Sequence, residues 1–291
     1  GQVSKLANVA SMESHGVEFT LSTRNISTKN FKWTTDFIFS NAKNKVTELK
    51  SDANVMSMIS GSGFALEGNP VRSLYSLNFQ GLNKEGLPTF INEKGELTVT
   101  DINFQERENK SHLVYEGSTD PTITGSFGNI FSYKGFKLNV FMTYSFGNVI
   151  RLDPVFHNAY SDLDATPREF KNRWTVAGDE KITTVPVIAD LRQNTMNSYL
   201  NKAYNAYNYS TERIAKGDFI RMKEISVTYE FPKTMVSKLS LSNLSLKIQG
   251  TNLFLLYADK KLNGQDPEFF NSGGVAVPVP KQFTLTLRLG I

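Results

Sequence analysis

The side chains that most often carry out chemistry in proteins are few and widely separated in this chain. It has no cysteine and three histidines, His15, His112 and His157, and none is followed by a second histidine two or four residues later. Closely spaced ligands of that kind usually mark a zinc site. No serine, histidine and aspartate set and no glycine-rich phosphate loop after a strand can be recognised. The sequence therefore predicts neither a histidine-based metal site nor an enzyme.

Two groups of loop carboxylates offer the oxygen ligands that Ca²⁺ prefers. One is Asp266-Pro267-Glu268, and the other consists of Asp162, Asp164 and Glu169. A solvated turn explains both groups with fewer assumptions, because carboxylates are common in exposed loops. We therefore expect no cofactor and keep calcium in these loops as the alternative.

Aromatic residues gather in one long polar segment and could form a binding surface. Aromatic rings stack on sugar rings and on peptide side chains, and they are enriched where proteins meet. Packing within the segment would use the same residue types. Direct substrate contact, contact with a partner protein and internal packing all stay open for Trp174, Tyr199, Tyr204, Tyr207 and Tyr209.

Strict alternation indicates the elements that carry these loops. The clearest example is the last stretch, where Phe283, Leu285, Leu287, Leu289 and Ile291 alternate with Thr284, Thr286, Arg288 and Gly290. In a strand, this pattern turns one face to apolar surroundings and the other to polar ones. About ten residues are enough for a tilted strand to cross a bilayer as part of a barrel wall.

Seven such strands are predicted, separated by short turns at one end and three long polar segments at the other. The strands cover about residues 16–26, 31–49, 122–133, 136–150, 218–231, 243–257 and 281–291. The long segments cover about residues 50–119, 151–217 and 258–280. Within them we expect pieces near 74–79 to extend strands above the membrane, and a short helix within 190–206. Outer-membrane barrels combine long outer loops with short inner turns in this way. The predicted fold is all-β, a transmembrane antiparallel β-barrel.

Seven strands do not close a barrel by themselves. They would leave two unpaired edges inside lipid, and bacterial single-chain barrels have an even number of strands. The chain also starts at Gly1 without a methionine or a signal peptide. We therefore expect this chain to be the C-terminal part of a larger barrel whose other strands, and any plug, lie elsewhere.

The alternation also assigns side chains to the two faces of the wall. Polar residues predicted to face the lumen are Glu224, Glu230, Lys247, Gln249 and Arg288. Arg221 and Lys223 fall on the same side as Ile225, which should face lipid. We expect these two cations to meet lipid headgroups at the rim, or to belong to a wall extension above the bilayer.

Composition and charge agree with this assignment and exclude other classes. The chain has 291 residues, 12% aromatic residues and a formal net charge of +4, with basic residues scattered among acidic ones. A scattered excess this small does not indicate a nucleic-acid partner. There is no apolar run of about 18 residues, so no transmembrane helix is predicted.

A set of motifs resembles one known family in order along nearly the whole chain. The clearest run is Gly217 to Ser226, which is followed by Pro232. The other motifs are Asn8 to Phe19, Gly68-Asn69-Pro70, Asp120-Pro121, Tyr133 to Phe136, Arg173-Trp174, Gly178-Asp179-Glu180, Thr251 to Phe254, Asp266-Pro267-Glu268 and Pro278 to Phe283. This set resembles the C-terminal region of the SusC/RagA-type TonB-linked outer-membrane transporters of Bacteroidetes.

The resemblance implies a 22-stranded barrel with an N-terminal plug, of which this chain would supply the last seven strands. It implies active import of a large nutrient, an oligosaccharide or a peptide, with a SusD-like surface lipoprotein as a lid. Energy would come from the TonB-ExbB-ExbD system acting through the plug, and two transporter–lipoprotein pairs would form a dimer. The protein would be integral to the bacterial outer membrane.

Three other functions are compatible with the residues alone. A passive porin or adhesin barrel would lack a plug and a lipoprotein partner. A soluble β-sandwich binding domain would pack the faces of Phe136 and Phe283 against each other in water. A secreted hydrolase is disfavoured because no acid/base pair can be recognised.

Overall fold

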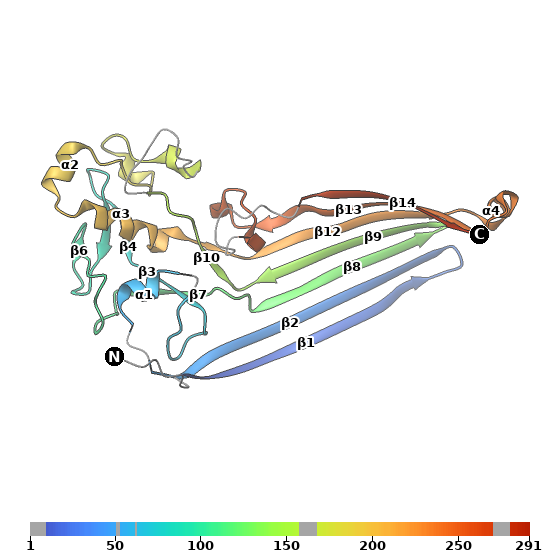
Figure 1. Cartoon of the computed structure of the whole chain (residues 1–291), viewed down its shortest axis with the longest axis horizontal. Helices are drawn as coiled ribbons and strands as arrows, with labels where there is room; N and C mark the ends of the chain where they lie inside the picture. The colour runs from blue at the N-terminus through green and yellow to red at the C-terminus, as the bar shows by residue number, and fades with distance from the viewer. Residues whose placement is uncertain (1–9, 51–52, 62, 157–167, 270–279) are drawn as a thin grey trace, which may run out of the picture.

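A seven-stranded antiparallel sheet dominates the computed structural model, which describes residues 10–50, 53–61, 63–156, 168–269 and 280–291. We call this sheet the wall (Figure 1). Its strands, in their order across the sheet, are β1 (Ala10–Ser27), β2 (Phe31–Leu49), β8 (Ile123–Tyr133), β9 (Phe136–Phe146), β12 (Phe219–Glu230), β13 (Asn243–Ala258) and β14 (Gln282–Gly290). The predicted all-β fold is therefore confirmed, with 48% of residues in strands and 17% in helices.

The strand limits differ from the predicted ones where the backbone turns. β1 already starts at Ala10 rather than at Gly16. The strand predicted over 136–150 ends at Phe146, because Gly147 adopts a φ of 86° that a continuing strand does not use. The residues after it form β10 (Val149–Arg151), which leaves the wall and pairs with β11 (Ile214–Lys216).

Short connections join the wall strands at the end far from the loops. β8 and β9 meet at Lys134 and Gly135, whose φ angles of 45° and 89° suit a two-residue hairpin turn. β12 and β13 are joined by α4 (Lys233–Val236) and η4 (Ser237–Leu239), and the C-terminus lies beside them (Figure 1). None of the helices in the described part of the chain is both long and apolar enough to cross a membrane.

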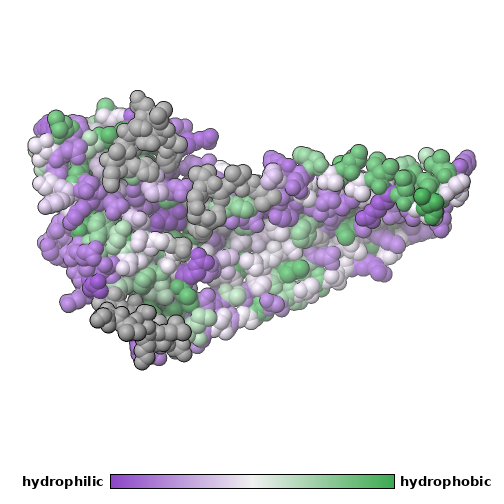
Figure 2. All heavy atoms as spheres, in the orientation of Figure 1, coloured by the Kyte–Doolittle hydropathy of each residue, from purple (hydrophilic) through white to green (hydrophobic). Residues whose placement is uncertain are grey.

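One face of the wall is apolar and exposed. On β14, Phe283 and Leu285 are 77% and 69% exposed, and their neighbours on the same face are equally apolar. Exposed apolar residues on this face include Val17, Phe19, Leu21, Phe127, Phe136, Val227, Ile248, Leu287 and Leu289. Figure 2 shows such residues as green atoms along the edge where β13 and β14 lie. An apolar surface this large is normally covered by a membrane or another protein.

Two glycines on β8 make room for large rings from β9 on opposite faces. Gly125 lies directly opposite Tyr144, and Gly128 lies directly opposite Phe141. The Tyr144 hydroxyl crosses Gly125 and donates to the Ile38 carbonyl of β2 at 2.8 Å. Phe141 covers Gly128, where an added Cβ would lie 3.3 Å from its ring. This explains why Phe141 interrupts the polar side of an otherwise regular alternation.

A β-bulge on β12 changes which face of the wall is occupied by the residues that precede it in the strand. Met222 pairs with Met142 and Glu224 with Phe141, so Lys223 has no partner on β9. The extra residue brings Arg221 onto the same face as Glu224, away from Ile225. The prediction that Arg221 meets lipid headgroups is therefore wrong, because simple alternation does not hold across a bulge.

The long segments fold into one compact body at the other end of the wall, which we call the cap. It comprises the described residues of 53–118, 150–217 and 259–269 (Figure 1). Besides β10 and β11, its elements are α1 (Val55–Ile59), β3 (Ser73–Leu77), β4 (Phe79–Leu82), β5 (Pro88–Ile91), β6 (Leu97–Thr98), β7 (Leu113–Ser118), η1 (Arg168–Asn172), η2 (Asp179–Lys181), α2 (Leu191–Met196), α3 (Leu200–Asn208), η3 (Thr211–Arg213), η5 (Lys260–Leu262) and η6 (Pro267–Phe269).

Local sequence explains the two helices that replace the one predicted within 190–206. A capping box between Asp190 and Gln193 starts α2, and Tyr199, with a φ of 65°, separates α2 from α3. The strand pieces near 74–79 pair inside the cap, β3 with β7 and β4 with β5, rather than extending the wall. The cap therefore has a core of its own, built around Ile59, Leu77, Phe90 and Tyr207.

Candidate functional site

Three of the five candidate aromatic residues pack inside the cap. Tyr207 has no exposed surface and meets Phe156 and Phe79 edge-on at centroid distances of 5.6 and 5.5 Å. Tyr204 and Tyr209 pack against the same core. A fully buried ring cannot stack on a ligand at the surface, so Tyr207 is not a stacking contact. Amphipathic spacing along α3 places it inward.

Trp174 connects two segments of the cap. Its ring lies over Gly86, where an added Cβ would come within 2.7 Å of the indole. The indole N–H donates to Glu180 at 3.2 Å, and the Trp174 backbone N–H donates to Val185 at 2.9 Å. Gly86, with a φ of 77°, both makes the turn and admits the ring. Trp174 therefore joins the loop of β4 and β5 to the segment around η2.

Tyr199 is the candidate that presents its ring to the surroundings. It is 71% exposed, and the Lys202 ammonium lies 5.4 Å from its ring centroid. Leu191 and Met196 on the neighbouring α2 are also exposed. Of the five aromatic candidates, Tyr199 is thus the one suited to touch a partner or a ligand at the cap surface.

A cavity of about 550 Å³ opens in the cap between η1, η2, η3 and η5. This volume lies within the range of small-ligand pockets. Its lining comprises Leu152, Glu169, Asn172, Arg173, Asp179, Ile182, Thr183, Thr184, Val185, Tyr207, Glu212, Arg213, Lys261 and Asn263. The residue types pointed to Tyr207 and Glu169 of this set as candidate ligand contacts, whereas Arg173 and Asp179 lay only within the family motifs. The three-residue spacing of Phe170 and Arg173 favours contact between the ring and the cation, and it was the sequence signal that could have identified Arg173.

Ion pairs hold the two sides of this cavity together. Arg213, which is buried, pairs with Glu169 and donates to the Asp153 carbonyl at 2.6 Å. The Asn263 amide donates to Glu169 at 2.8 Å, and Lys261 lies 3.7 Å from Glu212. The last segment of the cap is thereby tied to η1 and η3. Glu169 is occupied by Arg213, while Asp162, Asp164 and His157 lie outside the described residues.

Burial shifts the titration of several cap residues. It raises the pKa of the Tyr207 hydroxyl and lowers the pKa of the Arg151 guanidinium to about 10. Burial also raises the pKa of Glu116, which Arg151 opposes through its charge. At neutral pH Arg151 keeps its proton, and it donates to the Tyr75 carbonyl at 2.6 Å. Arg151 of β10 thereby contacts β3 inside the cap.

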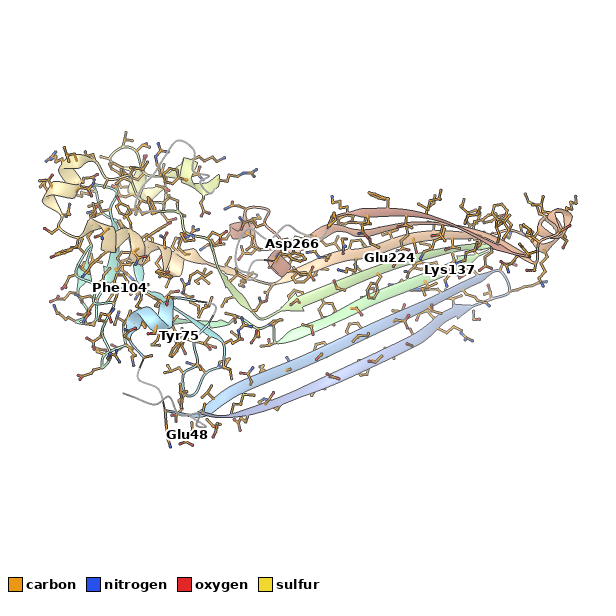
Figure 3. All side chains as sticks on the ribbon, viewed as in Figure 1. Glu48, Tyr75, Phe104, Lys137, Glu224 and Asp266 are labelled. Carbon is orange, nitrogen blue, oxygen red and sulfur yellow. The ribbon has the colours of Figure 1, made fainter. Side chains whose placement is uncertain are left out.

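Arg221 fastens the last cap segment to the wall. Its guanidinium pairs with Asp266, and its Nε lies 2.7 Å from the Glu268 carboxylate. Arg221 and Asp266 are both nearly buried. Figure 3 shows Asp266 at the place where this segment meets the wall. The Asp266-Pro267-Glu268 carboxylates thus bind a guanidinium of the same chain.

The polar residues predicted to face the lumen lie together on the face of the wall opposite the apolar one. We call this polar face the inner face and the apolar one the outer face. The Glu224 carboxylate accepts from Asn139 at 3.1 Å and from Ser226 at 2.9 Å, and it lies 3.6 Å from the Lys247 ammonium. Figure 3 shows Glu224 and Lys137 within the wall, with Glu224 nearer to Asp266 than Lys137 is. The register places Glu230, Gln249 and Arg288 on the same face, opposite Leu246 and Leu287.

Comparison with known proteins agrees with this architecture. No protein-family model matches the chain. It is 26% identical over 284 residues to the TonB-dependent receptor P3 of Formosa agariphila, covering 92% of this chain and 26% of that protein. It is 25% identical over 338 residues to the TonB-dependent receptor P39 of the same organism, covering 98% of this chain and 31% of that protein. The chain thus spans about a quarter to a third of the length of these relatives.

Solved structures identify the fold. The RagAB peptide transporter structure matches with a TM-score of 0.71 and 21% identity over 98% of this chain and 30% of that chain. The RagAB peptide importer in its open-open state matches with a TM-score of 0.70 and 21% identity, over 97% and 29% of the two chains. The wall is therefore a segment of a barrel of this kind. The predicted resemblance to SusC/RagA-type TonB-linked transporters is confirmed.

Proposed function

We propose that this chain is part of a TonB-dependent importer of the bacterial outer membrane. The observation that carries the proposal is the two-faced wall with its free edges. Its outer face is apolar and exposed, its inner face is polar, and β1 and β14 each lack a second neighbour among the described strands. An isolated sheet cannot leave such edges in lipid. Further strands of the receptor would pair with both edges and close the barrel.

The partners proposed for the complete receptor follow from the same assignment. A plug would fill the barrel and contact inner-face groups such as Glu224 and Lys247. The TonB-ExbB-ExbD system would supply energy through the plug, and a SusD-like lipoprotein would close over the cap, where Tyr199 is exposed. Two transporter–lipoprotein pairs would associate as a dimer. The similarity to the RagAB peptide importer and to TonB-dependent receptors supports these proposals.

The cargo would be a large nutrient, an oligosaccharide or a peptide, and the chain would do no chemistry on it. It would contribute wall, cap and binding surface, and no cofactor is needed for that role. The RagAB structures are of a peptide transporter, which supports a peptide, while the exposed aromatic residue suits either class.

Uptake by living cells tests this function. Cells with and without the receptor gene would be given a mixture of oligosaccharides and peptides, and depletion of each compound would be followed by mass spectrometry. We expect depletion of a subset that stops when TonB is deleted or the proton gradient is collapsed. Depletion that persists without TonB would indicate a passive porin instead. Recovery of the protein without detergent would contradict the barrel.

A further inference from the structure

The cap cavity has most of its charged groups already engaged. Glu169 pairs with Arg213, and Glu212 lies beside Lys261. Asp179 accepts hydrogen bonds from the Thr175 N–H, the Thr175 hydroxyl and the Val176 N–H at 2.9 to 3.0 Å. Cations balance the charges of Glu169 and Glu212, and the hydrogen bonds to Asp179 satisfy its carboxylate without neutralising it. The groups that remain decide which ligand the cavity can hold.

The remaining cation of the lining is Arg173. Among the described residues no carboxylate forms an ion pair with it, whereas Arg213 pairs with Glu169 and Lys261 lies beside Glu212. The Tyr207 hydroxyl lies near Arg213 and is fully buried, so neither water nor a ligand in the cavity reaches it.

The Arg173 guanidinium packs against an aromatic ring of η1. Its guanidinium carbon lies 5.2 Å from the centre of the Phe170 ring. An aromatic ring that holds the face of a guanidinium leaves the N–H groups in its plane available. Those N–H groups match the two oxygens of a carboxylate, which they bind as a pair of charge-assisted hydrogen bonds. Leu152 and Val185 supply apolar walls beside them.

We infer that this cavity binds the carboxylate of a transported molecule, either an acidic sugar or the C-terminus of a peptide. The inference rests on the proposed import function, since it names what the receptor would select. Arg173 would bind the carboxylate with its paired N–H groups. Arg213, Glu169 and Asn263 would keep the two walls of the cavity at a fixed spacing.

Titration calorimetry on the full-length receptor, purified in detergent, tests the inference. Two matched pairs of probes differ in one carboxylate: glucuronate against glucose, and trialanine against trialanine amide. We expect the carboxylate member of at least one pair to bind about tenfold tighter or more. A response to glucuronate alone would identify an acidic sugar, and a response to trialanine alone would identify a peptide C-terminus.

Variants separate this site from general electrostatic attraction. Arg173→Gln should weaken binding of the preferred probe about tenfold to a hundredfold. Arg168→Gln removes the same charge five residues earlier, at the start of η1, from a position that does not line the cavity, and should leave binding unchanged. Tyr207→Phe keeps the buried ring and removes only a hydroxyl that the ligand does not reach, so it should leave binding unchanged.

Three results would overturn the inference: no preference for a carboxylate, full binding by Arg173→Gln, or an equal loss with Arg168→Gln. The binding assay needs no TonB. Carboxylate binding without import would therefore refute only the transport proposal. Import without carboxylate binding would refute only this inference.

Discussion

Arg221 on β12 binds Asp266, a residue 45 positions later in the chain, and so joins the wall to the cap. Both side chains are nearly buried, and Glu268 completes the contact at 2.7 Å. The bulge at Lys223 makes this possible, because it turns Arg221 from the outer face to the inner one.

Replacing Arg221 should loosen the last cap segment. Arg221→Met leaves Asp266 buried without its partner, and breaking a buried ion pair costs about 3–5 kcal/mol. Amide hydrogen exchange should rise in residues 259–269 and stay unchanged in β8 and β9. Arg288→Met is a control, since Arg288 is exposed on the same face. An equal effect of both variants would show that Arg221 does not fasten the segment.

The two glycines of β8 should tolerate alanine very differently. A Cβ on Gly125 would clash with the Ile38 carbonyl and the Tyr144 hydroxyl, whereas a Cβ on Gly128 would meet the Phe141 ring at 3.3 Å. Gly125→Ala should therefore impair barrel assembly or lower stability by about 1–3 kcal/mol, the usual cost of overpacking. Gly128→Ala should change it by less. Heat-modifiable migration on gels and urea unfolding in bilayers measure both, and equal behaviour would contradict the packing described.

Tyr207 and Tyr199 should have opposite phenotypes when each is replaced by alanine. Removing the buried Tyr207 ring creates a cavity in the cap core and should cost about 3–5 kcal/mol. Tyr199→Ala removes an exposed ring and should leave cap stability within about 0.5 kcal/mol. Limited proteolysis of the cap distinguishes the two. Rapid cleavage of the Tyr199 variant alone would contradict the assignment of Tyr207 as the buried ring and Tyr199 as the exposed one.

Cap stability should fall as the medium becomes acidic, because of His112. Burial lowers the pKa of His112 below its usual 6.5, although Glu93 and Glu106 oppose the shift. The unfolded cap therefore takes up a proton before the folded one does. Stability is full above about pH 6.5 and is lost as pH falls from there toward the lower folded pKa. Hydrogen exchange of the cap at pH 7.5 and pH 5 measures the loss.

A matched pair of variants assigns that pH dependence. Neither ring nitrogen of His112 has a hydrogen-bond partner among the described residues, so His112→Leu should remove the dependence without creating an unpaired group. His15→Leu alters an exposed histidine on β1 and should leave it intact. If the cap of His112→Leu still loosened between pH 7.5 and pH 5, another group would have to be responsible.

Alternation was enough to predict the wall. Period-two patterns such as Phe283 to Ile291 are local properties of the chain, so the strands, their two faces and the inner placement of Glu224 and Lys247 could be read from residue types. The ordered motifs added the resemblance to TonB-linked transporters. Nothing in that pattern required knowledge of which distant segments meet.

Only the tertiary structure decided the features that depend on distant partners. A bulge is set by pairing with two neighbouring strands, so the inward turn of Arg221 could not be read from β12 alone. The pleat of β9 turns Phe141 inward, and only the pairing with β8 places Gly128 opposite it to make room for its ring. Tyr207 is buried and Tyr199 exposed, although both lie in one aromatic cluster of the sequence, because packing of two separate long segments determines the core of the cap. Long-range packing of this kind leaves no periodic signal in a single sequence.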